Sequence, residues 1–142
     1  MKRIIPAVIL LLGFLVSYGQ DDKVYQEVDQ MPVYPGCDTA DKDQEEKTKC
    51  TNQNIIQFIG DNLKYPKGAK EGKVEGMVLT RFVITKEGMV DKIEIVQDIG
   101  SDYGQAAIDV LNLLSGVKGW TPGVKEGKQV AVQYILPINF KL

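Results

Sequence analysis

Two cysteines carry the most evident chemistry of this chain. Cys37 and Cys50 are its only thiols, and the twelve residues between them include eight charged side chains and a single apolar one, Ala40. An even number of cysteines favours a disulfide when a chain is exported to an oxidising compartment. Closing so short a loop contributes about 3 kcal/mol in the chain-entropy model. The alternative interpretation is a pair of free thiols in a mobile loop.

Other reactive groupings are missing from the sequence. The chain has no histidine, so Ser–His and Cys–His nucleophile systems are excluded. Two thiolates alone do not complete a closed zinc site. Asp102 and Asp109 fit a helix cap and a solvated helix face better than a catalytic carboxylate pair. We therefore expect no enzymatic activity, no metal and no cofactor.

The first nineteen residues have the layout of a secretory signal peptide. Lys2 and Arg3 precede an apolar run over residues 4–16, and the small residues Ser17 and Gly19 mark a cleavage site after Gly19. The alternative is an uncleaved membrane anchor. As a helix, however, this run spans about 20 Å, against a hydrocarbon core of about 30 Å.

Cleavage would leave 123 residues (142 minus 19) and no membrane span. The 17 basic residues fall to 15 without Lys2 and Arg3, against 19 acidic ones, so the net charge becomes about −4. An acidic domain without a basic stripe is a poor candidate for binding nucleic acid or anionic lipid. The remaining length suits one domain with one core.

Two helices are predicted in the mature part. The first is capped by Thr51 or Asn52 and runs to about Leu63, with its apolar residues on one face. The second opens with a capping box of Asp102 and Gln105 and carries apolar residues at helical spacing. Both patterns indicate helices that bury one face against a sheet.

A β-hairpin separates these helices. Its strands are predicted at Val74–Ile84 and Val90–Val96, both rich in β-branched residues, and Gly88 suits the tight turn between them. A further strand follows the second helix. Consecutive antiparallel strands with helices on one face form a small α+β fold.

The last strand is the strongest functional signal. Large apolar residues occupy every even position from Val130 to Leu142, as in a strand with one buried face. Pro137 places this strand at an edge or a bulge, and an edge offers unpaired backbone groups to another extended chain. The predicted contact residues are Val130, Ala131, Val132, Gln133, Tyr134, Ile135 and Leu136. Trp120 and the side chain of Tyr134 are interpreted as core rather than as ligand contacts.

From Tyr65 to Leu142 the chain resembles the C-terminal domain family of TonB, the periplasmic energy transducer. The order and spacing of several short motifs carry this resemblance. They are Tyr65-Pro66, residues 72–78 (GKVEGMV), residues 82–90 (FVITKEGMV), Trp120-Thr121-Pro122-Gly123, residues 127–130 (GKQV) and residues 136–140 (LPINF).

The resemblance implies a three-stranded antiparallel sheet with two helices packed on one face. It also implies a periplasmic, non-enzymatic module that binds the N-terminal box of TonB-dependent outer-membrane transporters as a strand added beside the last strand. Full-length transducers carry an inner-membrane helix and a long proline-rich spacer, whereas this chain has six prolines and no proline-rich run.

The expected organisation is therefore a signal peptide (1–19), an extended lead-in with a cysteine-stapled loop (20–50) and a TonB C-terminal-like domain (51–142). Two other uses of the chain stay open at this point. The same strand edge can pair with its own copy in a homodimer, which makes a structural module without a transport role. An uncleaved signal segment makes a short membrane-tethered transducer.

Overall fold

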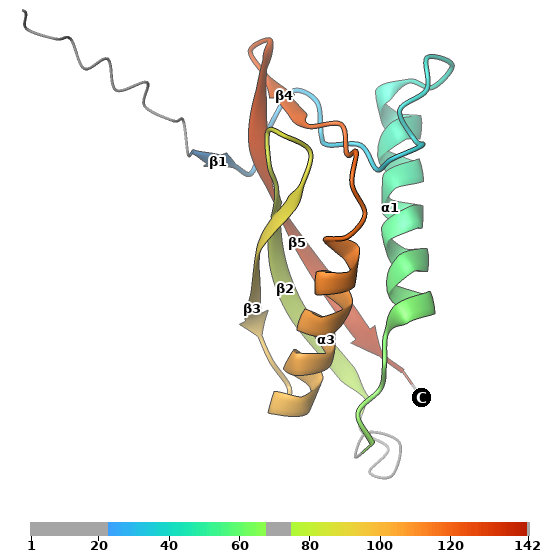
Figure 1. The fold of residues 1–142 in the computed structure, drawn as a ribbon, viewed down its shortest axis with the longest axis vertical. Coiled ribbons are helices and arrows are strands. Elements are labelled where there is room, and N and C mark those ends of the chain that lie inside the picture. The colour runs from blue at the N-terminus through green and yellow to red at the C-terminus, as the bar shows by residue number, and fades with distance from the viewer. Residues whose placement is uncertain (1–22, 68–74, 142) are drawn as a thin grey trace, which may run out of the picture.

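The computed structural model of this chain describes residues 23–67 and 75–141 (Figure 1). The predicted signal peptide and most of the connection after the first helix lie outside the described residues. The elements are β1 (Val24–Tyr25), α1 (Gln44–Asn62), β2 (Gly76–Ile84), β3 (Val90–Gln97), α3 (Ser101–Leu114), β4 (Gly123–Lys125) and β5 (Lys128–Phe140). The predicted succession of helix, hairpin, helix and final strand is confirmed.

A three-stranded antiparallel sheet forms the centre of the fold, with β2 between β5 and β3. β2 pairs with β5 without a register shift, from Gly76 opposite Phe140 to Ile84 opposite Val132. The turn into β3 needs a left-handed residue, which Gly88 supplies with a φ of +79°. β4 adds a short antiparallel pairing to β5, and β1 adds a parallel one. The predicted α+β fold is confirmed, with a sheet that is mixed overall.

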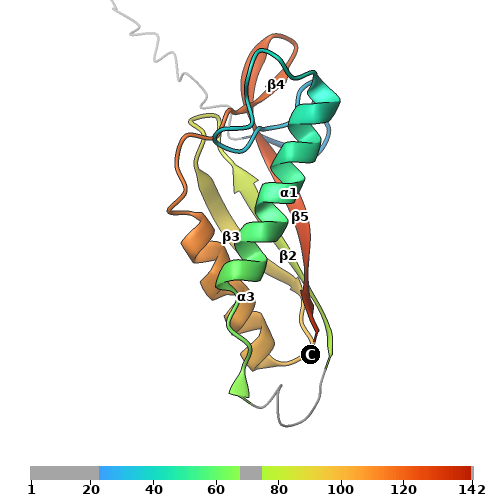
Figure 2. The same cartoon turned by 90° about the vertical axis from the view of Figure 1, so that its right-hand side faces the viewer.

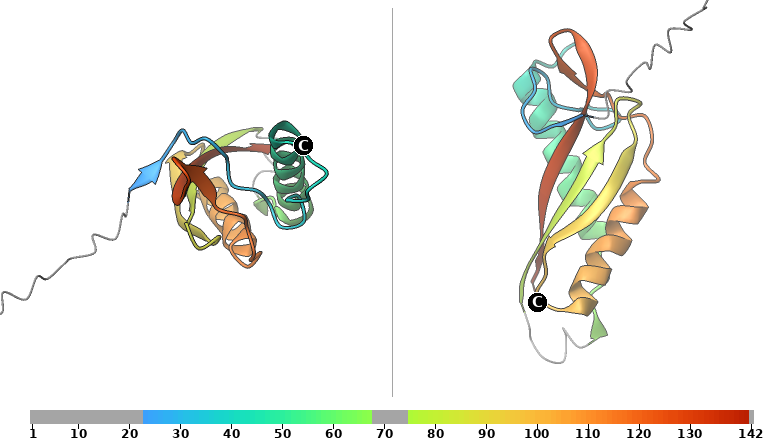
Figure 3. Two further views of the ribbon diagram at one scale, coloured as in Figure 1. Left: turned by 90° about the horizontal axis from the view of Figure 1, so that it is seen from above. Right: turned by 90° about the vertical axis from the view of Figure 1, so that its left-hand side faces the viewer.

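Both helices lie on the same, concave face of the curled sheet (Figures 2 and 3). The core between the layers contains the inward side chains of β2 and β5 and one stripe of each helix. Its members include Ile55, Ile59, Val78, Phe82, Ile84, Leu111, Leu114, Ile138 and Phe140. Trp120, only 3% exposed, also belongs to this core and meets the Tyr34 ring edge-to-face at 5.0 Å between centroids. The core interpretation of Trp120 is confirmed.

Helix α1 begins earlier than predicted. Its N-cap is Asp43, whose carboxylate accepts a hydrogen bond from the Glu46 N–H at 2.8 Å. Glu45 and Glu46 in the first turn also favour the positive end of the helix dipole. Residues 44–49 of the charged segment before Cys50 are therefore the first six residues of one 19-residue helix, and only residues 38–43 remain outside it. No helix in the described part of the chain is long and apolar enough to cross a bilayer.

Helix α3 lacks the predicted capping box. Its N-cap is Gly100, which has no side chain, and Asp102 already lies inside the helix. The Asp98 carboxylate holds the residues just before the helix, since its Oδ1 accepts from the N–H groups of Ile99 (2.7 Å) and Gly100 (3.2 Å). Gln105 donates instead to Asp109, one turn further along at 2.8 Å. The predicted cap Asp102 lies two residues after the observed N-cap, so the capping-box prediction was wrong.

Candidate functional site

Strand β5 uses its two edges differently. One edge pairs with β2 from Val132 to Phe140. On the opposite edge β1 pairs with Ala131 and Val132. β4 pairs with the preceding stretch of β5, Lys128–Val130. Among the described residues no strand pairs with the outer edge from Gln133 to Asn139. We call this stretch the free edge.

The structure divides the seven predicted contact residues into two groups. Val130, Ala131 and Val132 already pair with β4 or β1. The other four residues, Gln133 to Leu136, lie on the free edge, which continues to Asn139. Contact with a partner stays a prediction for all seven, and only the second group is open to a new strand without displacing part of the chain.

An apolar groove runs beside the free edge. It has a volume of about 490 Å³ and is bounded by α1 on one side and by residues 134–139 of β5 on the other. Ile55, Ile56, Ile59 and Leu63 line its helical wall. Ile56 is 67% exposed and Ile135 on the strand is 53% exposed. A polypeptide laid along the free edge would therefore find apolar surface for its side chains next to unpaired backbone groups.

Tyr134 fixes the strand at the start of this groove. Its ring stacks on Phe82 at 5.4 Å between centroids, and its hydroxyl donates to the carbonyl of Pro32 at 3.2 Å. Burial raises the pKa of the Tyr134 hydroxyl to about 12. Two residues further along, the carbonyl of Leu136 accepts from the buried Thr80 hydroxyl at 2.7 Å. The strand behind the free edge is thus held by its side chains as well as by the β2 ladder.

Comparison with known proteins bears directly on this site. A model of the family described as Gram-negative bacterial TonB protein C-terminal matches residues 61–142. The chain belongs to this TonB C-terminal family. Domains of this family are periplasmic, non-catalytic transducer modules that interact with TonB-dependent receptors. No curated protein sequence matches the chain.

Two solved structures are similar to this TonB C-terminal domain. The solution structure of the Helicobacter pylori TonB C-terminal domain has 23% identity and a TM-score of 0.53, covering 72% of this chain and 86% of that one. A shorter form of the same H. pylori domain has 25% identity and a TM-score of 0.49, covering 63% and 91%. The first similarity establishes a shared fold of two helices and a mixed, curled sheet.

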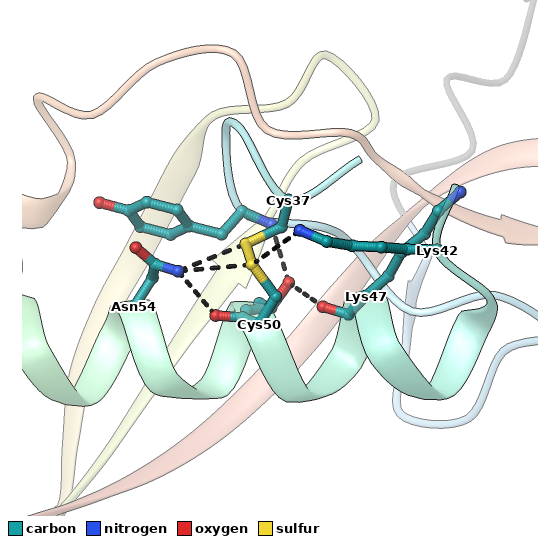
Figure 4. Close-up of a disulfide and its surroundings, with 7 residues drawn as sticks. Cys37, Lys42, Lys47, Cys50 and Asn54 are labelled. Carbon is teal, nitrogen blue, oxygen red and sulfur yellow. Dashed lines mark hydrogen bonds between the residues drawn. A yellow bond between two sulfur atoms is a disulfide. The ribbon is translucent and has the colours of Figure 1, made fainter. Parts of the chain in front are cut away.

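The predicted disulfide is present and lies outside the segment that matches the TonB family model. Cys37 and Cys50 are bonded, with their Cα atoms 5.8 Å apart (Figure 4). Because Cys50 lies within α1, the bond attaches the lead-in to the helix that walls the groove. Asn54 donates to the Cys50 carbonyl at 2.8 Å, and its amide nitrogen lies within 3.5 Å of both sulfurs. The disulfide therefore attaches the lead-in to the helix that walls the groove, and does not close a loop that is otherwise unattached.

Polar contacts reinforce this attachment of the lead-in to α1. The buried Thr51 hydroxyl donates to the Lys47 carbonyl at 2.8 Å and accepts from the Tyr34 N–H at 3.0 Å. Lys47 also forms an ion pair with Asp38 at 2.8 Å. Two hydrogen bonds to the Asp38 carboxylate lower its pKa. The bond from Lys47 has the larger effect and the bond from Thr121 the smaller one. The lead-in is therefore attached to α1 by polar contacts as well as by the disulfide.

The lead-in then crosses the β4 end of the sheet. Val33 and Thr121 exchange backbone hydrogen bonds of 2.9 Å in both directions, and Gln30 forms a bridge with Val124. The Glu126 N–H donates to the Asp29 carboxylate at 2.8 Å. This segment holds the β4–β5 hairpin in place and sets where the free edge begins.

The helical wall of the groove was not predicted as part of the site. One signal was available, because Ile55 and Ile56 are adjacent and a helix turns by about 100° per residue. Both cannot face the core, and Ile56 is the one that points outward. The described residues contain no group of three or more Cys, Asp or Glu side chains that could hold a metal ion.

Proposed function

We propose that this TonB C-terminal domain recognises an extended segment of a TonB-dependent outer-membrane transporter by strand addition at the free edge, Gln133–Asn139. The observation that carries the proposal is an unpaired strand edge beside an apolar groove. Backbone groups of the edge would supply affinity, and the groove would select side chains of the incoming peptide. In the periplasm, this binding would support energy-coupled transport across the outer membrane.

The chain itself provides a small precedent for this mode of binding. β1 pairs with Ala131 and Val132 in parallel, directly before the free edge. The same edge therefore accepts a strand where one is supplied. The free edge contains seven residues, which span about 23 Å at about 3.3 Å per residue. It suits a peptide of six or seven residues running in the direction of β1.

Pro137 limits the ladder within this edge. Proline has no N–H, so one donor is missing from the strand at that position. We expect the peptide to depend most on the four residues from Gln133 to Leu136, which were predicted as contacts and precede the proline. Apolar side chains near Pro137 would then be bound mainly through the groove.

Titration with box peptides tests the proposal. In a strand, alternate residues direct their backbone groups to the neighbouring strand. Proline substitution at every second peptide position should abolish binding, whereas proline at the intervening positions should be tolerated. The amide resonances of Gln133–Asn139 should shift on binding. If the proline variants of both sets bind as well as the parent peptide, strand addition is refuted.

Two further measurements separate this proposal from its competitors. Self-association through the free edge predicts a dimer that the peptide dissociates. Light scattering across a concentration range therefore distinguishes homodimer formation from peptide binding by a monomer. The proposed cleavage after Gly19 predicts an exported protein that begins at Gln20. Mass spectrometry of the exported protein decides between this mature form and a membrane-tethered one.

A further inference from the structure

Four lysines from separate parts of the chain surround one hollow at the β4 end of the sheet. Lys23 precedes β1, Lys86 lies in the turn between β2 and β3, and Lys125 and Lys128 flank the turn between β4 and β5. These segments meet at the same end of the fold (Figure 3). The hollow has a volume of about 540 Å³ and is also lined by Tyr25, Glu126, Gln129 and Val130. We call it the lysine hollow.

The backbone around the hollow fixes the spacing of its charges. Lys125 and Lys128 are Cα partners across a two-residue turn. That turn consists of Glu126 and Gly127, with φ values of +51° and +76°, the conformation that matches the twist of a tight hairpin. Tyr25 contacts two ammonium groups, since Lys23 Nζ and Lys125 Nζ are 4.9 and 5.0 Å from its ring centroid. Two of the four charges thus lie against the same ring.

The positive charge of the hollow is not balanced locally. Within residues 23–67 and 75–141, none of the four lysines forms an ion pair with a carboxylate. Glu126 is the only acidic residue that lines the hollow. Nearby, the Asp29 carboxylate accepts the Glu126 N–H, and Glu87 follows Lys86 in the turn. Four ammonium groups held around one space repel one another, and a bound anion would relieve that repulsion.

We propose that the lysine hollow binds an acidic segment of a partner polypeptide, through two or more Asp or Glu carboxylates. A space of about 540 Å³ fits a few side chains. The chain as a whole has a net charge of −2 and would repel an extended polyanion such as nucleic acid. The Tyr25 ring and Val130 add apolar wall, which suits the side-chain stems of Glu. A short peptide is thus the anion that this surface favours.

The hollow lies beside β1, directly before the start of the free edge. A partner that adds a strand at Gln133–Asn139, parallel to β1, would place the residues preceding that strand toward the hollow. The acidic segment is then expected on the N-terminal side of the pairing core. This placement rests on the proposed function, whereas carboxylate binding by the hollow does not.

A peptide of alternating Glu and Pro tests the hollow separately from strand addition, because its prolines prevent ladder pairing. The matched control alternates Gln and Pro. We expect the Glu peptide to bind the mature chain weakly and to shift the resonances of residues 23–25, 86 and 125–130. The Gln peptide should shift none of them. Raising the salt from about 50 to 500 mM should weaken the interaction, since exposed charges are screened over a few ångströms at high salt.

Charge-removing variants complete the test. The quadruple variant Lys23→Gln, Lys86→Gln, Lys125→Gln, Lys128→Gln should bind the Glu peptide about tenfold more weakly, at a factor of about two for each exposed pair. The control removes four exposed lysines elsewhere, Lys49, Lys64, Lys118 and Lys141, and should change binding less than twofold.

Several outcomes would overturn the proposal. They are equal binding of the Glu and Gln peptides, resonance shifts outside the hollow, and undiminished binding by the quadruple variant. Tighter lysine-dependent binding to an oligonucleotide or to anionic vesicles would reject a peptide as the occupant. A neutral box peptide reports on the free edge alone, so either proposal can fail while the other holds.

Discussion

Tyr25 of β1 pairs with Val132 of β5 in parallel register, and the free edge begins at the next residue of β5. The pairing is only two residues long. It nevertheless determines how far a visiting strand can extend along β5 toward the lysine hollow. β1 therefore sets the length of the free edge as well as contributing to the sheet.

Disrupting β1 should lengthen that edge. In a variant with Val24→Pro and Tyr25→Pro, the N–H groups of β1 are lost and Ala131 and Val132 become available. A peptide long enough to reach these residues should bind several-fold to tenfold more tightly, at about 1 kcal/mol per added hydrogen bond. A peptide restricted to the free edge should bind as before.

The matched control for this experiment carries Val24→Ser and Tyr25→Ser, which remove the side chains but keep the backbone donors. Calorimetric titration of both variants with the long and the short peptide measures the effect. Equal affinities of the proline and serine variants for the long peptide would show that β1 does not compete for the edge.

The disulfide should contribute measurably to stability. Replacing both Cys37 and Cys50 by Ala removes a bond with a sequence separation of 13. We expect the free energy of unfolding to fall by about 3 kcal/mol, because the unfolded chain regains the entropy of a loop of this length. Urea unfolding of the variant and of the reduced wild-type chain should agree. A change below about 1 kcal/mol would show that the lead-in is held mainly by its other contacts.

Thr51 is the polar residue on which the lead-in most depends. It is fully buried, and its hydroxyl joins the Lys47 carbonyl to the Tyr34 N–H. Thr51→Val keeps the shape of the side chain and leaves the Tyr34 donor unsatisfied. The expected loss of stability is about 1–3 kcal/mol. Thr48→Val, at an exposed position of the same helix, is the control and should change stability by less than about 0.5 kcal/mol.

Local patterns explain which parts of the fold were predictable. The alternation from Val130 to Phe140 and the turn at Gly88 depend on neighbouring residues, and all three predicted strands are present. The start of α1 was missed because residues 44–50 carry almost no apolar signal. Their helix is held by the Asp43 cap and by the disulfide at Cys50, and the second of these contacts is tertiary.

The missed parts of the candidate site depend on contacts between distant residues. β1 pairs Val24 with Ala131, a two-residue strand that no sequence window can detect. The lysine hollow combines Lys23, Lys86 and the β4–β5 turn, so its lysines are not clustered in the sequence and no local pattern indicates them. The free edge itself was predicted because its strand has a strong period of two and contains Pro137. The length of the free edge was not predicted, since the pairing of β1 with Ala131 and Val132 determines where the free edge begins.

Tyr134 should make stability depend on pH at the alkaline end. The ordinary pKa of tyrosine is 10.0, and burial raises that of Tyr134 to about 12. The folded state therefore keeps its proton where the unfolded state loses it, so this stabilising contribution is complete below pH 10 and is lost as the pH rises through about 12. In Tyr134→Phe this dependence is absent.

The stability difference between wild type and Tyr134→Phe isolates this effect from other titrating groups. Below pH 10 the wild type should be more stable by about 1 kcal/mol, since its hydroxyl donates to the Pro32 carbonyl. Between pH 10 and 12 that advantage should shrink and then reverse, with a slope of at most about 1.4 kcal/mol per pH unit. A difference that stays constant over this range would contradict a buried, protonated hydroxyl.

Ile56 offers the cleanest test of the groove. Its side chain is 67% exposed and lines the helical wall, so it adds little to the folded core. Ile56→Asn should leave the unfolding free energy within about 1 kcal/mol of wild type. It should weaken box-peptide binding several-fold, because apolar contact in the groove is lost at about 25 cal/mol per Å² of buried surface. Leu113→Asn, at a 53% exposed position of α3 outside the groove, is the matched control. If the two variants bind the peptide equally well, the peptide does not use the groove and affinity comes from the strand edge alone.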